Sequence, residues 1–121
     1  MPNFNLTKSD KQLISKSLDK SIQLMGISKS DAAEILMIDP EQLNDFIKSS
    51  FESNSQKVQI SLQIIKIYRS LFALAGNNKK FMTHFLYTDN HYFSARPIDV
   101  MKSLPGLVKV EQFLNAMCEK V

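Results

Sequence analysis

A chain of 121 residues with 44% hydrophobic side chains fits one compact domain, or two small helical subdomains that share a core, and excludes a disordered protein. Its single cysteine excludes an internal disulfide, and we expect Cys118 to be a small, half-buried filler in a reducing compartment. The net charge of +3 is unevenly spread, with +3 on residues 1–30, −5 on residues 31–56 and +5 on residues 57–121.

The sequence predicts no membrane-spanning segment. The longest apolar run, residues 64–75, is interrupted by Lys66, Arg69 and Ser70, and it is far shorter than the ~20 apolar residues that cross a bilayer. Residues 1–4 lack a basic region followed by an apolar signal core. We therefore expect a cytoplasmic protein with no membrane partner.

Helical periodicity organises the first part of the chain. From Ser9, apolar residues recur at helical spacing until Gly26 ends the helix. This stripe comprises Ile14, Leu18, Ile22 and Met25. Ser28 can cap a second helix through its hydroxyl, with Asp31 three residues on as a capping-box partner. The second helix carries Ala32, Ala33, Ile35, Leu36 and Met37.

The pair Asp39-Pro40 marks the next boundary, because Asp39 can cap a helix and Pro40 already has the φ angle of a first helical turn. A third helix follows, and we expect its apolar residues to face inward. These are Leu43, Phe46, Ile47 and Phe51. The polar residues 52–56 indicate a hinge or a frayed helix end.

The longest predicted helix spans residues 57–75 and has an unusually broad apolar face. Its members are Ile60, Ile64, Ile65, Tyr68, Leu71, Phe72 and Leu74. One small neighbour cannot cover so broad a face, so this helix either joins both subdomains in one core or packs at a dimer interface. Gly76-Asn77 is expected to end it, since both residues tolerate the left-handed conformation.

Three shorter elements complete the chain. We predict a helix over residues 78–86 and a loop over residues 87–93. Pro97 can open another short helix, with Asp99 in its first turn where the helix dipole favours a carboxylate, and Pro105-Gly106 is expected to close it. The last helix has an apolar stripe formed by Leu107, Val110, Leu114 and Met117. No segment has the apolar pattern of a β-strand, so the predicted fold is all-α.

The first 56 residues resemble a helix-turn-helix unit: a helix, a glycine turn, a capped alanine-rich helix, a break and a third helix. The residues that carry the resemblance are Ser28, Ala32, Ala33, Leu36, Asp39 and Leu43. In such units the third helix lies in the major groove of DNA. The resemblance implies DNA contacts by Ser28, Gln42, Asn44 and Lys48.

The charge of this surface weighs against DNA binding by the chain alone. DNA affinity rests largely on neutralised phosphates, yet the surface carries Glu41 and Asp45 against Lys48 alone. Gln42 and Asn44 could read adenine edges, but base contacts need phosphate contacts to position them, which lysines of the first helix could supply. A three-helix packing unit without any nucleic-acid role is the alternative.

A closer match lies in the second half of the chain. Its residues, in order, are Leu71-Phe72-Ala73-Leu74-Ala75-Gly76, Phe85-Leu86, Asn90, Arg96-Pro97-Ile98-Asp99-Val100-Met101, Gly106-Leu107-Val108 and Val110. This order resembles the toxin-binding domain of the Xre/MbcA/ParS-type antitoxins, whose partners are RES-domain toxins. With the helix-turn-helix unit in front, the resemblance covers about residues 10–117.

The resemblance implies an antitoxin of a type II toxin-antitoxin system, with a helix-turn-helix-like domain over residues 1–56 that binds operator DNA or mediates assembly. A long helix and a small helical domain, residues 57–121, would hold a RES-domain toxin and block its active site. Such toxins consume NAD, so catalysis would belong to the partner. We expect no enzyme activity and no cofactor, and a homodimer or a hetero-oligomer with the toxin.

The predicted toxin-binding surface, or its support, comprises Phe81, Phe85, Asn90, Tyr92, Arg96, Asp99, Val110, Phe113, Met117 and Lys120. The loop aromatics Tyr87, Tyr92 and Phe93 are favoured as contacts, because exposed aromatics are enriched at binding hot spots. Taken singly, Arg96 could simply bridge Asp99, and the helical phenylalanines could belong to the core.

Three departures from the family pattern stand out: Phe85, residues 92–95 and the short segment after Met117. Phe85 replaces a common tryptophan and loses its indole donor, and residues 92–95 replace a more glycine-rich turn. Little chain follows Met117, so the last helix itself is expected to do the blocking.

No catalytic or metal site is predicted. His84 and His91 lack metal-ligand spacing with the distant Cys118, and three glycines form no phosphate-binding loop. Two alternatives to the antitoxin hypothesis are a stand-alone helix-turn-helix transcriptional regulator and a dimeric helical scaffold without DNA or toxin partner.

Overall fold

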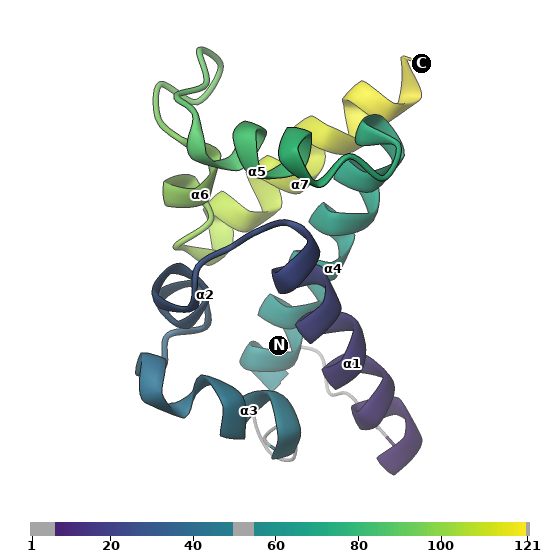
Figure 1. The fold of residues 1–121 in the computed structure, drawn as a ribbon, viewed down its shortest axis with the longest axis vertical. Helices are drawn as coiled ribbons and strands as arrows, with labels where there is room; N and C mark the ends of the chain where they lie inside the picture. Colours follow the sequence, from purple (N-terminus) through teal and green to yellow (C-terminus); the bar gives the residue numbers. More distant parts are fainter. Residues whose placement is uncertain (1–6, 50–54, 121) are drawn as a thin grey trace.

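The computed structural model describes residues 7–49 and 55–120, and it confirms the all-α prediction for this part of the chain (Figure 1). The elements are α1 (Lys8–Leu24), α2 (Lys29–Leu36), the 3-10 helix η1 (Pro40–Gln42), α3 (Leu43–Ser49), α4 (Ser55–Ala75), α5 (Lys79–Tyr87), α6 (Pro97–Val100) and α7 (Leu104–Glu119). Along the longest axis, α3 lies near one end, and the α5–α6 loop and the end of α7 lie near the other (Figure 1).

Helix α1 begins one residue earlier than predicted, because Thr7 caps it. The Thr7 hydroxyl accepts the Asp10 N–H at 3.0 Å, and the Asp10 carboxylate accepts the Thr7 N–H at 3.1 Å. Leu18, Ile22 and Met25 of the predicted stripe are buried, and Ile14 is half-buried against the core. The predicted periodicity of this helix is therefore confirmed.

Gly26 ends α1 as predicted, and the structure shows why only glycine fits. Its φ is +70°, and a Cβ added there would overlap the hydroxyl of Thr83 in α5. The same hydroxyl donates to the Met25 carbonyl at 2.9 Å. The turn after α1 is thus packed directly against the second half of the chain.

Helix α2 buries Ala32, Ala33, Ile35 and Leu36. Met37, expected within this helix, is instead its left-handed C-cap with a φ of 59°, and 53% of it is exposed. The boundary at Asp39-Pro40 is confirmed, but the Asp39 side chain makes no capping hydrogen bond, since the chain enters a 3-10 turn there. That part of the prediction was wrong.

Helix α3 buries Leu43 and Phe46 and packs against α1, where the Ser15 hydroxyl donates to the Ile47 carbonyl. Phe51 and residues 52–54 of the predicted hinge lie outside the described residues. Residues 55 and 56 of that hinge are the first residues of α4, so the helix starts earlier than predicted.

Helix α4 lies between α1 and α7 and contributes to one core with both. Its fully buried apolar residues are Val58, Ile60, Ile64, Ile67 and Leu71. Val58 and Ile67 were missing from the predicted face, whereas Phe72, which was included, is 38% exposed. The broad apolar face of α4 therefore joins the two halves of the chain in one core. This was the first of the two roles expected for it. The division into domains at residue 56 stays a prediction.

By length and composition, α4 is the one helix among the described residues that could cross a membrane, over Gln56–Ala75. The apolar stretch is thus longer than the sequence analysis allowed. Its apolar side supplies core residues to the contacts with α1 and α7, which accounts for its hydropathy.

Pro105-Gly106 does not separate two helices, contrary to prediction. Ser103 caps α7 by accepting the Gly106 N–H at 3.1 Å, and Pro105 lies in the first turn, where its missing N–H is not needed. A Cβ on Gly106 would overlap the Val100 carbonyl of α6. This glycine permits the close approach of α6 to α7.

Candidate functional site

Three aromatic rings, from α5 and the loop over residues 88–96, pack around Phe113 of α7. Its ring centroid lies 4.9 Å from Tyr92, 5.2 Å from Phe93 and 6.3 Å from Phe85. Tyr92 is 64% exposed, whereas the other three rings are half-buried. The cluster therefore presents one ring to solvent on a support of three anchored rings.

Two exposed apolar side chains extend this cluster along its helices. Phe81 lies one turn before Phe85 in α5 and is 46% exposed, and Met117 lies one turn after Phe113 in α7 and is 41% exposed. We call the set the aromatic face; it comprises Phe81, Phe85, Tyr92, Phe93, Phe113 and Met117. Exposed apolar side chains that gather in this way mark interaction surfaces.

Val110 and Lys120, both predicted for this site, differ in position. Val110 is fully buried, so it can support the aromatic face from within but cannot touch a partner. Lys120 is exposed at the C-cap of α7, where it is free to reach a bound protein.

Asn90 organises the loop that presents Tyr92. Its N–H donates to the Ala95 carbonyl at 2.9 Å, and its side-chain oxygen accepts the Tyr92 N–H at 2.8 Å. Ser94 closes the turn with a φ of 54°. Asn90 thus holds the loop backbone by hydrogen bonds. This backbone in turn fixes the direction of the Tyr92 side chain.

Arg96 and Asp99 form a two-pronged ion pair at the start of α6. Arg96 Nε lies 2.9 Å and Nη2 3.2 Å from the two carboxylate oxygens of Asp99. The guanidinium carbon is also 5.6 Å from the centroid of the Tyr87 ring, which favours a cation–π contact. Hydrogen bonding from Arg96 lowers the pKa of Asp99. The simpler interpretation, that Arg96 bridges Asp99, is therefore confirmed.

Lys102, which sequence reasoning missed, connects this pair to the N-terminal half. Its ammonium lies 2.9 Å from Asp31, 3.3 Å from Glu34 and 3.3 Å from Asp99. The hydrogen bond to Asp31 is the largest of the effects that raise the pKa of Lys102 well above its usual range. No local pattern predicts this contact, because Asp31 and Lys102 are brought together only by the fold.

Tyr87 completes the cap of α2 in place of the predicted partner. Ser28 accepts the Asp31 N–H at 3.1 Å as expected, but the Ser28 N–H donates to the Tyr87 hydroxyl at 3.0 Å. That hydroxyl donates in turn to the Asp31 carboxylate at 2.7 Å. Tyr87 was predicted in a loop but is the last residue of α5, where it is half-buried and its hydroxyl is used inside the protein.

Burial shifts the pKa of both members of this pair. It raises the pKa of the Asp31 carboxyl, but hydrogen bonds from Lys102, Tyr87 and Ser28 outweigh it and leave the pKa below its usual value. For Tyr87, burial is the largest effect, and the net pKa lies above the usual value of 10.0. Both groups are therefore held in the protonation state that makes the hydrogen bond.

The residues predicted to touch DNA are only partly grouped. Gln42, Asn44 and Lys48 are exposed on η1 and α3, and Glu41 and Asp45 are exposed beside them. Ser28 lies at the start of α2, with its hydroxyl and its N–H used inside the protein. The elements that carry the aromatic face, namely α5, the α5–α6 loop and the second half of α7, lie toward the other end of the molecule from α3 (Figure 1).

Within residues 7–49 and 55–120, no group of three histidine, cysteine, aspartate or glutamate side chains is arranged to hold a metal ion. Cys118 is half-buried, as expected, and its thiol lies 3.4 Å from the Ser70 carbonyl.

Comparison with curated proteins found no match for this chain. A family comparison matched residues 70–119, less than half of the chain, to the antitoxin Xre/MbcA/ParS C-terminal toxin-binding domain. All six residues of the aromatic face, together with Arg96, Asp99 and Lys102, lie inside this segment. The resemblance seen in the sequence is thus confirmed over residues 70–119, and it indicates an antitoxin that has a toxin-binding domain.

Proposed function

We propose that this protein neutralises a RES-domain, NAD-consuming toxin by placing its aromatic face over the entrance to the toxin active site. The observation that carries the proposal is the location of that face inside the segment similar to toxin-binding domains. That similarity names neither the residues that contact the toxin nor the class of toxin, and both belong to what we propose.

The geometry of the aromatic face suits tight protein binding. Tyr92 is a large, rigid and exposed side chain, which is the type enriched at hot spots. Asn90 and Phe113 hold it before any partner arrives, so little ordering has to accompany binding. Phe81 and Met117 widen the contact on either side.

Charged residues follow members of the aromatic face closely in the sequence, since Arg96 comes three residues after Phe93 and Lys120 three residues after Met117. Such residues suit the rim of an interface. The Arg96–Asp99 pair is partly exposed, with 41% of each side chain accessible, and Lys120 is exposed at the end of α7. Rim charges chiefly steer association and fix orientation. In this proposal α7 covers the toxin active site with its exposed side, and no flexible tail is needed.

The test is rescue of growth when the protein is co-expressed with a RES-domain toxin encoded beside it. Deletion of residues 107–121 is expected to abolish rescue, but α7 supplies core residues and such a deletion disturbs the fold. Tyr92→Ala is the cleaner variant, and Leu13→Ala, which alters an equally exposed apolar residue of α1, is its matched control. Equal rescue by both variants would contradict the assigned face.

We further propose a cytoplasmic location and autorepression of the operon through Gln42, Asn44 and Lys48. Their exposure on η1 and α3 supports this second role. The alternatives make different predictions: a stand-alone regulator binds DNA without any toxin, and a helical scaffold self-associates without binding either partner.

A further inference from the structure

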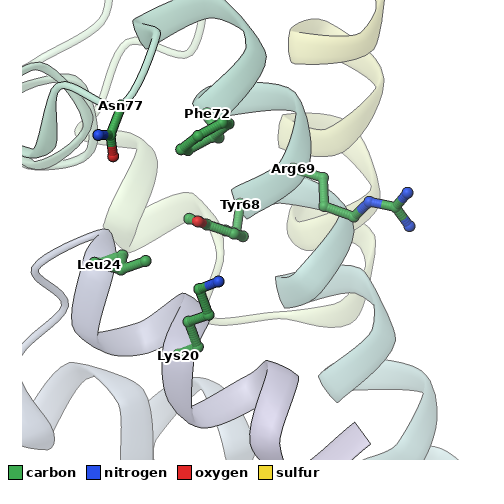
Figure 2. Close-up of a pocket in the computed structure, with 6 residues that line it drawn as sticks. All are labelled: Lys20, Leu24, Tyr68, Arg69, Phe72 and Asn77. Carbon is green, nitrogen blue, oxygen red and sulfur yellow. The ribbon is translucent and has the colours of Figure 1, made fainter. Parts of the chain in front are cut away.

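A groove of about 570 Å³ lies between the end of α1 and the second half of α4 (Figure 2). It is lined by Lys20, Leu24, Tyr68, Arg69, Phe72 and Asn77. Neither the aromatic face nor the proposed DNA-contacting set of Gln42, Asn44 and Lys48 includes any of these residues, so the proposed function leaves the groove unexplained.

The groove combines an apolar wall with a cationic border. The rings of Tyr68 and Phe72 lie 5.8 Å apart at 50°, and Phe72 is 38% exposed. In Figure 2, Lys20 points toward Tyr68, whereas the Arg69 side chain extends away from the other five labelled side chains. Among the described residues, neither cation forms an ion pair. A fitting ligand therefore has an apolar group flanked by carboxylates.

The chain itself carries such a group at the turn after α2. Met37 is 53% exposed and has a φ of 59°, a conformation that glycine adopts at lower energetic cost. A large apolar side chain is thus held in a strained position where it adds little to the core. Contact with another molecule accounts for such an exposed side chain, because burial in the contact would remove its apolar surface from water.

Carboxylates flank Met37 on both sides. Glu34 and Asp39 line one hollow together with Met37, and both are exposed. Glu34 lies 3.3 Å from Lys102, but 60% of its side chain remains accessible. Residues 34–39, the last turn of α2 together with the turn after it, are here called the Met37 turn. An exposed apolar side chain between carboxylates makes this segment complementary to the groove in polarity and charge.

We propose that the groove binds the Met37 turn of a second copy of this chain. Met37 would lie against Tyr68 and Phe72, since methionine sulfur makes favourable contacts with aromatic rings. Glu34 and Asp39 would face Lys20 and Arg69. The two surfaces come from different elements, so the contact is heterologous and each copy offers one donor turn and one acceptor groove.

The first test is sedimentation velocity over rising protein concentration at low salt. Wild type is expected to form dimers and larger species, and added salt is expected to weaken them because exposed charges are screened. Met37→Gly and Phe72→Ala should each weaken self-association by about tenfold or more. Tyr92→Ala, on the aromatic face, should leave it unchanged.

The decisive test mixes the two defective variants. Met37→Gly keeps an intact groove and Phe72→Ala keeps an intact turn, so an equimolar mixture should form a heterodimer that stops at two chains. The same logic applies to charge, because Lys20→Glu should self-associate weakly and regain association when mixed with Asp39→Lys. These exposed substitutions keep the core, and thermal melts of each variant verify the fold.

Three results would overturn the proposal. Wild type could stay monomeric at every concentration, Met37→Gly could associate as wild type does, or the mixture of Met37→Gly and Phe72→Ala could remain monomeric. A symmetric dimer formed through the groove alone would give the second result. Binding of a different acidic partner in the groove would give the first or the third.

Discussion

The hydroxyl of Tyr87 donates a 2.7 Å hydrogen bond to the carboxylate of Asp31, two residues that are 56 positions apart. Asp31 belongs to the first turn of α2, and Tyr87 ends α5 within the segment similar to toxin-binding domains. With Lys102 on the same carboxylate, this contact fixes α2 against the C-terminal helices. The two halves are therefore joined by a polar network as well as by the core.

Replacing Tyr87 with phenylalanine removes the hydroxyl and keeps the ring. The variant Tyr87→Phe is expected to lower the free energy of unfolding by about 1–3 kcal/mol, because the half-buried Asp31 loses a donor and the Ser28 N–H loses its acceptor. Urea denaturation measures the difference. Tyr92→Phe, at an exposed ring, is the control and should change stability by less than about 0.5 kcal/mol. Equal effects of the two variants would refute a role for the hydroxyl.

The polar network also predicts how stability depends on pH. Asp31 and Asp99 have lowered pKa values in the folded protein, so their contribution is complete above the ordinary value of 3.8 and is lost as the pH falls through the folded-state values. Tyr87 has a raised pKa, so its contribution is complete below 10.0 and is lost as the pH rises through its folded-state value. Melting temperatures should therefore decline on both sides of a broad neutral plateau.

The variant Asp31→Asn checks this assignment. It should be less stable than wild type on the plateau and should lose less stability on acidification, because the carboxylate that the folded state prefers is absent. If the melting temperature of Asp31→Asn fell at acidic pH as much as that of wild type, carboxylates other than Asp31 would be the cause of the acid decline.

Gly26 and Gly76 provide a matched pair for testing close packing. Both have positive φ, at +70° and +60°, so alanine should cost about 1–2 kcal/mol of backbone strain at either position. A Cβ on Gly26 would also overlap Thr83, whereas nothing lies within 4 Å of a Cβ on Gly76. Gly26→Ala should therefore be the more destabilising variant by about 1–3 kcal/mol in denaturant titrations. Similar losses would mean that the α1–α2 turn is not held against α5.

DNA binding is expected to strengthen when the toxin is present. Gln42, Asn44 and Lys48 are exposed beside Glu41 and Asp45, so a single chain neutralises few phosphates. A toxin complex that carries two or more copies should bind operator DNA about tenfold more tightly or better, through avidity. Gel shifts with and without toxin measure this, and equal affinities would contradict it. Lys48→Ala should remove one phosphate contact, which reduces the slope of the logarithm of the binding constant against the logarithm of the salt concentration by about one.

Local sequence signals predicted the helices well and their tertiary contacts poorly. Ser28, Gly26 and Gly76 were recognised as cap and stop residues because their roles depend on neighbours in the chain. Pro105 was read as a break, although proline is equally suited to a first helical turn. The deciding feature, the approach of α6 to Gly106, is not visible in the sequence.

In the candidate site, too, local features were predicted and contacts between distant segments were missed. The family resemblance indicated Phe85, Phe113 and Met117, and loop position favoured Tyr92; all four belong to the aromatic face. Lys102 and the inward turn of Tyr87 were missed because their partner, Asp31, lies far away in the chain. Ion pairs between distant segments leave no periodic pattern.

Calorimetric titration of the purified protein with a RES-domain toxin is the most direct test of the central claim, that the aromatic face binds and silences the toxin. Tyr92→Ala should weaken binding by about 30-fold, the effect of losing a hot-spot residue, while Leu13→Ala should bind as wild type does. Loss of toxin inhibition should follow the loss of binding. Wild-type affinity for the Tyr92→Ala and Phe81→Ala double variant, or no binding by wild type, would contradict the claim.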